Sequence, residues 1–249
     1  MLHGEYESMS LINQTVPTFS PKPIAWGKCK NHDRHFLLFS FHAIHKGLPS
    51  IPRFTYAVAQ LHTSSVDANP TGKFGFHVTT YNGTLPQDNT WADTWEEFYI
   101  RGMKRMLRLE KEARGPSDEL ERLSGPFLEK VIPRLIRPME TGGRRIKPVL
   151  IHGDLWLGNV STKDGSDNPL MYDSSAFWGH NECKNNLHQS LSIHLSPPTI
   201  QSANNVDELG IMRPLEDDWS RECMESYHRH IPKSEPRADW DARNALYAM

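Results

Sequence analysis

Residues 152–159 spell HGDLWLGN and directly follow the apolar run Val149-Leu150-Ile151. That run has the composition of a short buried strand, and the two glycines after it predict a loop at the strand end. Asp154 therefore lies where a strand gives way to a loop. A carboxylate in such a place is able to accept a proton from an attacking hydroxyl group.

Two further oxygen-bearing side chains follow at informative spacings. Asn159 offers an amide oxygen, a hard ligand that suits Mg²⁺. Asp173 ends the segment 169–173, which we interpret as the second strand of a hairpin that returns the carboxylate beside Asn159. Phosphoryl transfer needs this set, because a base orients the nucleophile and oxygen ligands hold Mg²⁺ on the phosphates. The order His-x-Asp-x-x-x-x-Asn, then a distant Asp, is the layout of kinase catalytic loops.

A purely structural interpretation of the same residues stays open. Asp154 and Asn159 are types that also cap helices and stabilise turns. The added Trp156, the two glycines and the spaced Asp173 favour the catalytic interpretation. We expect His152 to brace the loop through hydrogen bonds rather than to enter the chemistry.

Composition excludes several classes of protein. The net charge of -2 argues against an electrostatic nucleic-acid binder. Because no stretch approaches the ~18 apolar residues of a membrane span, we expect no membrane partner. The three cysteines are far apart and have neither metal-ligand nor redox-motif spacing. With no signal peptide visible at the N-terminus, a reducing, cytoplasmic compartment is expected.

Hydrophobic spacing predicts mostly helices, with few strands. The expected strands are 35–41, 149–151 and 169–173, and residues 66–92 are expected to form a long ordered loop. The expected helices are 1–15, 51–62, 91–109, 117–135 and a helical part from Leu209 onward.

Three stretches together resemble the fructosamine kinase family, which includes the protein-ribulosamine 3-kinases. They are HGDLWLGN at 152–159, YDSSA at 172–176 and WGHNE at 178–182. Further matching stretches are GKFGFH at 72–77, LPQ at 85–87 and WEEF at 95–98, and the tail 233–247 resembles the fungal branch.

The resemblance implies an α+β, protein-kinase-like fold of the aminoglycoside-phosphotransferase type. Residues 1–45 would then be a remnant of the N-terminal lobe with the hinge, and residues 46–249 the helical catalytic lobe. It further implies transfer of the ATP γ-phosphate to the 3-hydroxyl of a ketosamine on a glycated protein lysine or a small amine. The product sheds its sugar, so the family acts in deglycation repair.

The resemblance also implies a role for each matched residue. Asp154 would be the catalytic base, and Asn159 and Asp173 the ligands of Mg²⁺. Glu5 matches the glutamate that pairs with the ATP-anchoring lysine, and 40–42 (Ser40, Phe41 and His42) would be the hinge that meets adenine. Trp156 and His180 would shape the sugar site, although a packing role for Trp156 and a buried structural role for Glu182 stay open.

The chain departs from the family pattern at its beginning. The family's glycine-rich loop and anchoring lysine lie upstream of the position of Glu5, so we expect a truncated N-terminal lobe. Three functions stay open: an active ketosamine 3-kinase within a longer gene product, an inactive pseudokinase or interaction protein, and a kinase for another small hydroxyl compound such as an aminoglycoside or choline.

A second departure is the polar segment 183–207, about 24 residues that the family lacks at this place. Its composition predicts a disordered insertion. Cys183-Lys184 and Val206-Asp207 are compatible with codons that carry splice signals, so a retained intron and a genuine insertion are the alternatives. Sequencing the transcript across this junction separates them, since only an intron yields a spliced product that lacks the segment.

Overall fold

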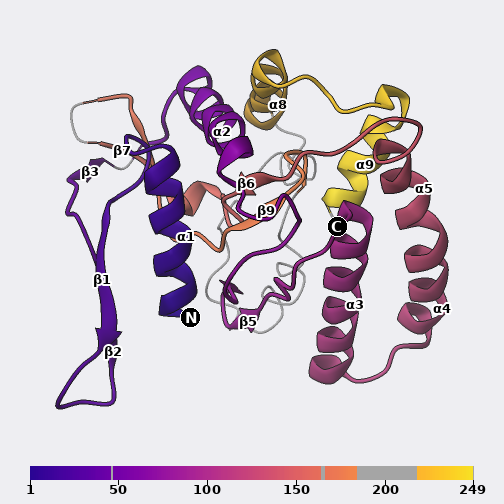
Figure 1. Ribbon diagram of the computed structural model, residues 1–249, viewed down its shortest axis with the longest axis horizontal. Coiled ribbons are helices and arrows are strands. Elements are labelled where there is room, and N and C mark those ends of the chain that lie inside the picture. Colours follow the sequence, from indigo (N-terminus) through magenta and orange to yellow (C-terminus); the bar gives the residue numbers. More distant parts are fainter. Residues whose placement is uncertain (46, 164–165, 184–217, 249) are drawn as a thin grey trace.

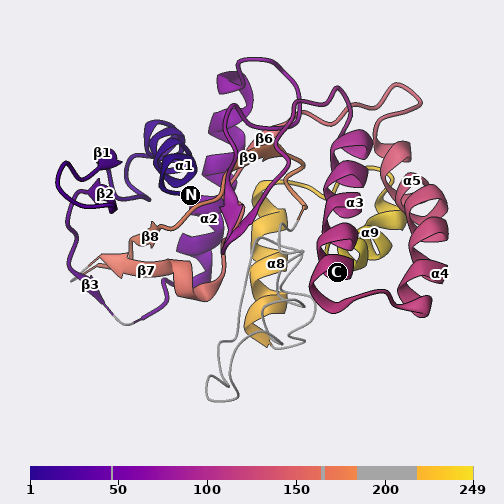
Figure 2. The ribbon, with the colours of Figure 1, turned by 90° about the horizontal axis from the view of Figure 1, so that it is seen from below.

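The computed structural model describes residues 1–45, 47–163, 166–183 and 218–248 (Figure 1). The hairpin of residues 23–39 and the helix Leu2–Thr15 form one side of the molecule, and the helices between residues 95 and 136 together with the helix Trp240–Tyr247 form the other (Figures 1 and 2). Short strands lie between them. No helix of the described part is long and apolar enough to cross a membrane.

The α-helices among the described residues are α1 (Leu2–Thr15), α2 (Ile51–Ser65), α3 (Trp95–Arg114), α4 (Asp118–Pro126), α5 (Ile132–Ile136), α8 (Asp218–His230) and α9 (Trp240–Tyr247). The strands are β1 (Pro23–Lys28), β2 (His35–Phe39), β3 (Ile44–His45), β4 (Tyr81–Asn82), β5 (Leu85–Pro86), β6 (Val149–Ile151), β7 (Val160–Lys163), β8 (Pro169–Met171) and β9 (Phe177–Gly179).

Helix α1 packs on the antiparallel hairpin β1–β2. The ring of His3 stacks on Trp26 with centroids 4.4 Å apart, and Met9 and Ile12 are buried on the inner side of the helix. The expected helix over 1–15 is confirmed, and the expected strand ends at Phe39 rather than at residue 41. Phe36 and Leu38 lie on the outer face of the hairpin and are exposed.

Two short ribbons at the centre of the molecule carry the segments around the HGDLWLGN stretch. Strand β6 is fully buried and pairs antiparallel with β9, with Val149 opposite Gly179 and Ile151 opposite Phe177. Strand β7 lies between β3 and β8. The hairpin β7–β8 pairs Val160 with Met171, so the prediction of a hairpin ending near Asp173 is confirmed. Helices α2 and α8 lie side by side against this centre (Figure 2).

Helices α3, α4 and α5 differ from the sequence prediction, since the helix expected over 91–109 runs from Trp95 to Arg114 and the one expected over 117–135 is interrupted. Helix α3 begins at Trp95, where the Thr94 hydroxyl accepts a hydrogen bond from the Glu97 amide, and this is the usual cap chemistry. The predicted continuous helix over 117–135 is wrong, because a π-helical turn at 127–131 separates α4 from α5. Pro126 and Pro133 lack the amide hydrogens that a regular helix needs, so the ladder is disrupted between them.

The long segment 66–92 is expected as an ordered loop and proves to be tied to the core. It contains the short pair β4–β5, and Gly75 exchanges two backbone hydrogen bonds with Trp178 of β9 at 3.1 and 2.8 Å. Gly75 has a φ of +135°, and a β-carbon there would lie 2.7 Å from the carbonyl oxygen of Asn89. Only glycine therefore fits at this approach.

A buried ion pair joins the segment after β9 to helix α9. A side-chain nitrogen of Arg243 lies 3.7 Å from a carboxylate oxygen of Glu182, and both side chains are almost fully buried. Glu182 accepts a 2.7 Å hydrogen bond from the amide of Ser234, and Arg243 donates to the carbonyls of Ser234 and Pro236 at 2.6 and 2.8 Å. Glu182 is thus a buried structural partner. The expected disordered insertion lies, apart from Cys183, outside the described residues.

Arg243→Ala should strongly destabilise the fold, because it leaves the Glu182 carboxylate buried without its cation. The loss expected for breaking such a pair is roughly 3–5 kcal/mol of unfolding free energy, measurable by urea titration. Arg134→Ala is the matched control, since Arg134 forms an exposed pair with Asp239. Equal midpoints for the two variants would contradict the structural role of the buried pair.

Candidate active site

The backbone carbonyl of His152 is one of the points that fix the loop after β6 to the segment after β8. The carbonyl oxygen of His152 accepts hydrogen bonds from the Ser174 hydroxyl at 2.7 Å and from the Ser175 amide at 3.0 Å. Gly153 has a φ of +84°, and a β-carbon there would lie 2.2 Å from the Ser175 carbonyl oxygen. The close approach of the two segments therefore requires glycine at this position.

The structure brings Asp154, Asn159 and Asp173 together, as predicted. The side-chain amide of Asn159 donates to the Asp154 carboxylate at 3.0 Å and to the Asp154 carbonyl at 2.8 Å. It also lies 3.4 Å from the carbonyl oxygen of Asp173. Asp173 itself has a φ of +59°, the left-handed region that non-glycine residues seldom adopt. One amide group thus spans the loop and the end of the hairpin.

Carboxylates from three elements interact electrostatically, since the charge of Asp173 acts on both Asp154 and Glu5. Burial, and then the charge of Asp173, raise the pKa of Asp154 to about 7. Burial and then Asp173 also raise the pKa of Glu5, on α1, to about 7. Burial raises the pKa of Asp173 itself. Crowded carboxylates of this kind disfavour one another's ionisation, and a bound cation relieves the repulsion.

A magnesium ion bound to nucleotide phosphates fits these residues. Among the residues that the structure places, no three His, Cys, Asp or Glu side chains form a metal-binding group by themselves. Mg²⁺ usually takes only one or two protein oxygens and completes its shell with water and phosphate oxygens. Asn159 and Asp173 offer such a partial set beside a surplus of negative charge.

His152 braces the loop, as expected. Its ring is fully buried, and burial lowers its pKa to about 3, so the imidazole is neutral. Its Nδ1 atom lies 3.4 Å from the amide of Asp154. The imidazole thus helps to position the backbone that carries Asp154.

Trp156 is half-buried, and its ring lies over Gly158. A β-carbon at Gly158 would lie 2.2–2.4 Å from three atoms of the ring, so this second glycine of the stretch also has a steric reason. The packing role considered for Trp156 is therefore present in the structure. Its contact with a sugar stays a prediction.

The segment 40–42 follows β2 and is held to the start of β1. The Ser40 amide donates to the Lys22 carbonyl at 2.8 Å, and the Ser40 hydroxyl lies 3.0 Å from the His42 ring. Phe41 is 92% exposed. The adenine contact of these residues stays a prediction.

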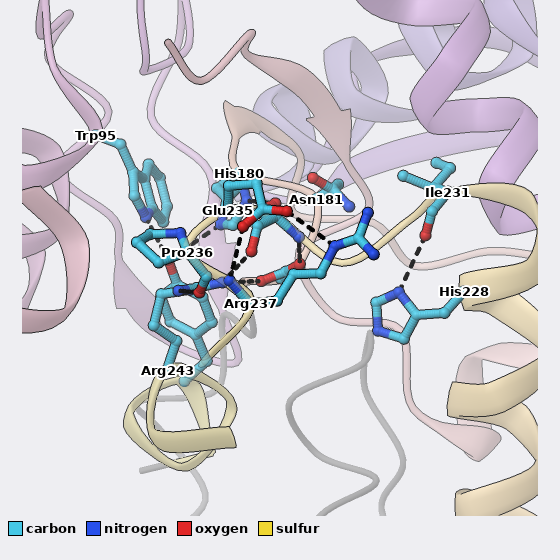
Figure 3. A network of polar contacts seen from close by, with 12 residues as sticks. Trp95, His180, Asn181, His228, Ile231, Glu235, Pro236, Arg237 and Arg243 are labelled. Carbon is cyan, nitrogen blue, oxygen red and sulfur yellow. Dashed lines mark hydrogen bonds and ion pairs between the residues drawn. The ribbon is translucent and has the colours of Figure 1, made fainter. Parts of the chain in front are cut away.

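His180 lies apart from the Asp154 group, at the opposite end of the β6–β9 ribbon. Its Nδ1 atom is 3.1 Å from the Tyr247 hydroxyl and its Nε2 atom 2.9 Å from the Ser234 hydroxyl (Figure 3). Burial lowers its pKa to about 4. The structure thus gives both ring nitrogens protein partners, and it does not bring His180 together with the other expected site residues.

Several supporting residues are missed by the sequence analysis. The Ser8 hydroxyl of α1 accepts from the Ala176 amide at 2.9 Å, and the Gln87 side chain donates to the Ser175 carbonyl at 3.1 Å. The Ser175 hydroxyl donates to the Asn82 side chain at 2.6 Å. Ser175 and Gln87 lie in the stretches YDSSA and LPQ, although the sequence assigns them no role. Ser8 and Asn82 have no local sequence signal.

Asp154→Asn should raise thermal stability more at pH 8 than at pH 4.5. An unfolded Asp has a pKa of about 4, so between about 4 and 7 the folded state holds a proton that the unfolded state has lost. The unfolding free energy due to this group therefore falls as pH rises through that window. The asparagine side chain carries no charge, so the variant avoids this loss of unfolding free energy above about pH 7.

Differential scanning fluorimetry at the two pH values measures the difference in melting temperature. Asp33→Asn, at a carboxylate that is 90% exposed, is the control and should show no such pH dependence. A gain for Asp154→Asn that is the same at both pH values would contradict the buried, repelled carboxylate.

Comparison with known proteins identifies relatives of this chain. The family model "Fructosamine kinase" matches residues 1–194. The ketosamine-3-kinase of Mus musculus is 42% identical over 112 residues, which are 44% of this chain and 33% of that protein. The chloroplastic protein-ribulosamine 3-kinase of Arabidopsis thaliana is 35% identical over 135 residues, 50% of this chain and 35% of that protein. The chain thus spans about a third of the length of these relatives.

Solved structures show the same fold. A protein assigned as a fructosamine-3-kinase from Haemophilus somnus 129PT superposes with a TM-score of 0.69 at 20% identity, over 99% of this chain and 69% of that one. A thermostable mutant of the aminoglycoside phosphotransferase APH(4)-Ia gives 0.53 at 12% identity, over 98% and 72%. The fold is therefore the α+β, protein-kinase-like fold that aminoglycoside phosphotransferases share, and with the family model matching most of its length, the chain belongs to the fructosamine kinase family.

Proposed function

We propose that this chain forms the catalytic lobe of an ATP-dependent kinase that phosphorylates the 3-hydroxyl of ketosamines such as fructosamine and ribulosamine. The convergence of Asp154, Asn159 and Asp173 carries the proposal, because these groups meet at one hydrogen-bonded amide. The names of the relatives from Mus musculus and Arabidopsis thaliana support the substrate class.

Asp154 is suited to orient and deprotonate the substrate hydroxyl. Its pKa of about 7 lies near neutral pH, where a base combines availability with proton affinity. Its hydrogen bond from Asn159 fixes the direction of the carboxylate. A cation bound nearby would lower the pKa of Asp154 and so increase the fraction of the carboxylate that is ionised.

Asn159 and Asp173 are the residues that would hold Mg²⁺. Because the Asn159 amide nitrogen points at Asp154 and the Asp173 carbonyl, its amide oxygen is the atom left for a metal. Mg²⁺ neutralises charge on the transferred phosphate. The left-handed backbone at Asp173 turns the chain sharply after β8 and directs its carboxylate toward this space.

Residues 1–45 supply the parts that would meet the nucleotide, and residues 46–249 the catalytic lobe. Glu5 faces Asp173 from α1, which suits a glutamate that pairs with a lysine near the phosphates. Residues 40–42 belong to the segment that connects β2 to β3, which is the expected hinge. Glycated protein lysines and small ketosamines are the proposed substrates, deglycation repair the role, and the cytoplasm the compartment.

Asp154→Asn should reduce phosphate transfer from ATP to a fructosyl-lysine or ribulosyl-lysine peptide by about 10²–10⁴-fold, the usual contribution of a general base. Transfer of radiolabelled γ-phosphate measures it, with Asp33→Asn as a control that keeps full activity. Undiminished transfer by Asp154→Asn would remove the base assignment.

The same assay separates the alternative functions. Transfer to an aminoglycoside or to choline, but to neither ketosamine, favours a kinase for another small hydroxyl compound. Failure of the parent chain to bind Mg-ATP favours an inactive interaction protein.

Asp173→Ala should weaken binding of Mg-ATP, because it removes the charged metal ligand. Isothermal titration calorimetry should show a Kd raised at least about tenfold, corresponding to roughly 1.4 kcal/mol. Asp93→Ala, at an exposed carboxylate paired with Lys73, should leave the Kd unchanged. An unaltered Kd for Asp173→Ala would take Asp173 out of the metal site.

A further inference from the structure

A cavity of about 460 Å³ opens at the end of the β6–β9 ribbon that lies away from Asp154. Its apolar wall consists of Val66, Met139, Ile146, Val149 and Ile231. Asn181 and Glu235, both labelled in Figure 3, add polar groups to its lining. Because the register of β6 with β9 places Ile151 and Val149 at opposite ends, this cavity is separate from the candidate active site.

The cavity has a surplus of positive charge. Arg144, Arg145 and Lys147 come from the segment that leads into β6, and all three line the cavity and are exposed. Its one carboxylate among the lining residues is Glu235, which forms a 2.9 Å ion pair with Arg237. An anion at this mouth would therefore meet two or three cations.

His62 adds a buried hydrogen-bond donor to the same lining. Its side chain is fully buried on α2, and its Nδ1 atom lies 2.8 Å from the Tyr227 hydroxyl. That hydroxyl accepts from the Asn181 amide at 3.1 Å, and we assign the tautomer in which its hydrogen is donated to His62 Nδ1. Burial and then the neighbouring His180 lower the pKa of His62 to about 3, so the ring is neutral.

A neutral imidazole that accepts at Nδ1 must carry its hydrogen at Nε2. The Nε2 atom of His62 is buried and has no hydrogen-bond partner among the residues that the structure describes. An unsatisfied buried donor is costly, and such atoms commonly mark a place for a ligand or water. The group that satisfies it must present an acceptor, such as a carboxylate or phosphate oxygen.

We propose that this cavity binds an organic anion whose apolar body lies against Val149, Ile146 and Ile231 and whose acidic group meets Arg145, Lys147 and the Nε2–H of His62. The apolar wall suits the body, and the cations and the donor suit a carboxylate or a phosphate. The site is independent of phosphate transfer at Asp154, so it stands whether or not the chain is an active kinase.

Calorimetric titration of the full chain tests the proposal with 1-naphthoate, 1-naphthyl phosphate and the neutral 1-naphthalenemethanol. Both anions should bind, or one of them if the pocket discriminates carboxylate from phosphate, and the neutral alcohol should bind at least about tenfold more weakly. The double variant Arg145→Ala/Lys147→Ala should weaken anion binding by about tenfold or more. The matched double variant Lys28→Ala/Arg34→Ala, at the distant β1–β2 hairpin, should not.

His62 is tested with a pair of variants that separate its two nitrogens. His62→Asn places an amide near the position of Nδ1 and removes the Nε2 donor, so it should weaken anion binding several-fold. His62→Gln restores a donor near Nε2 and should bind more tightly than His62→Asn. If both variants fail to fold, the surface double variant still decides.

Two results overturn the proposal. One is absence of binding by both anions at millimolar concentration. The other is binding that Arg145→Ala/Lys147→Ala and Lys28→Ala/Arg34→Ala weaken equally, since that places the anion outside this cavity.

Discussion

The side-chain amide of Asn159 is the contact on which the arrangement around Asp154 depends. A single NH₂ group reaches the carboxylate and carbonyl of Asp154 and approaches the carbonyl of Asp173. It therefore links a loop that follows one buried strand to the turn that follows another. Burial raises the pKa of both Asp154 and Asp173, and the hydrogen bond from Asn159 counteracts this rise at Asp154.

The rest of the fold serves to make that contact possible. The Ser174 and Ser175 contacts with the His152 carbonyl bring the two segments together, and glycine at 153 allows the backbones to approach. Helix α1 then contributes two side chains. The Ser8 hydroxyl accepts a hydrogen bond from the Ala176 amide, and the Glu5 carboxylate interacts electrostatically with Asp173. Polar residues this crowded lower stability, and proteins usually tolerate such a cost only where chemistry requires it.

Much of this centre is predictable from the sequence because the distances along the chain are short. Asp154, Asn159 and Asp173 lie within twenty residues, and a strand, a loop and a hairpin suffice to place them. Apart from their exact ends, the helices follow from apolar spacing, except where Pro126 and Pro133 interrupt the predicted helix over 117–135. Apolar periodicity does not register the amide hydrogens that these two prolines lack.

Other features could not be predicted, because they join residues far apart in the chain. The contact of His62 with Tyr227 spans 165 residues, and that of Trp95 with Tyr247 spans 152. Pairing of β6 with β9, rather than with the next strand along the chain, likewise joins separated segments, and α2 packs against β6. His180 resembles a site residue in sequence, yet its neighbours Tyr247 and Ser234 belong to the C-terminal part and are unknowable from local pattern.

The contacts of Asn181 and Glu182 have a consequence for how this chain tolerates change. Asn181 bonds to Tyr227 of α8, and Glu182 bonds to Ser234 and lies beside Arg243 of α9. Both residues precede the polar stretch, and all three partners follow it. The parts of the lobe before and after that stretch are thus joined directly by side-chain contacts. The same anchoring points would serve chains of quite different length at this junction.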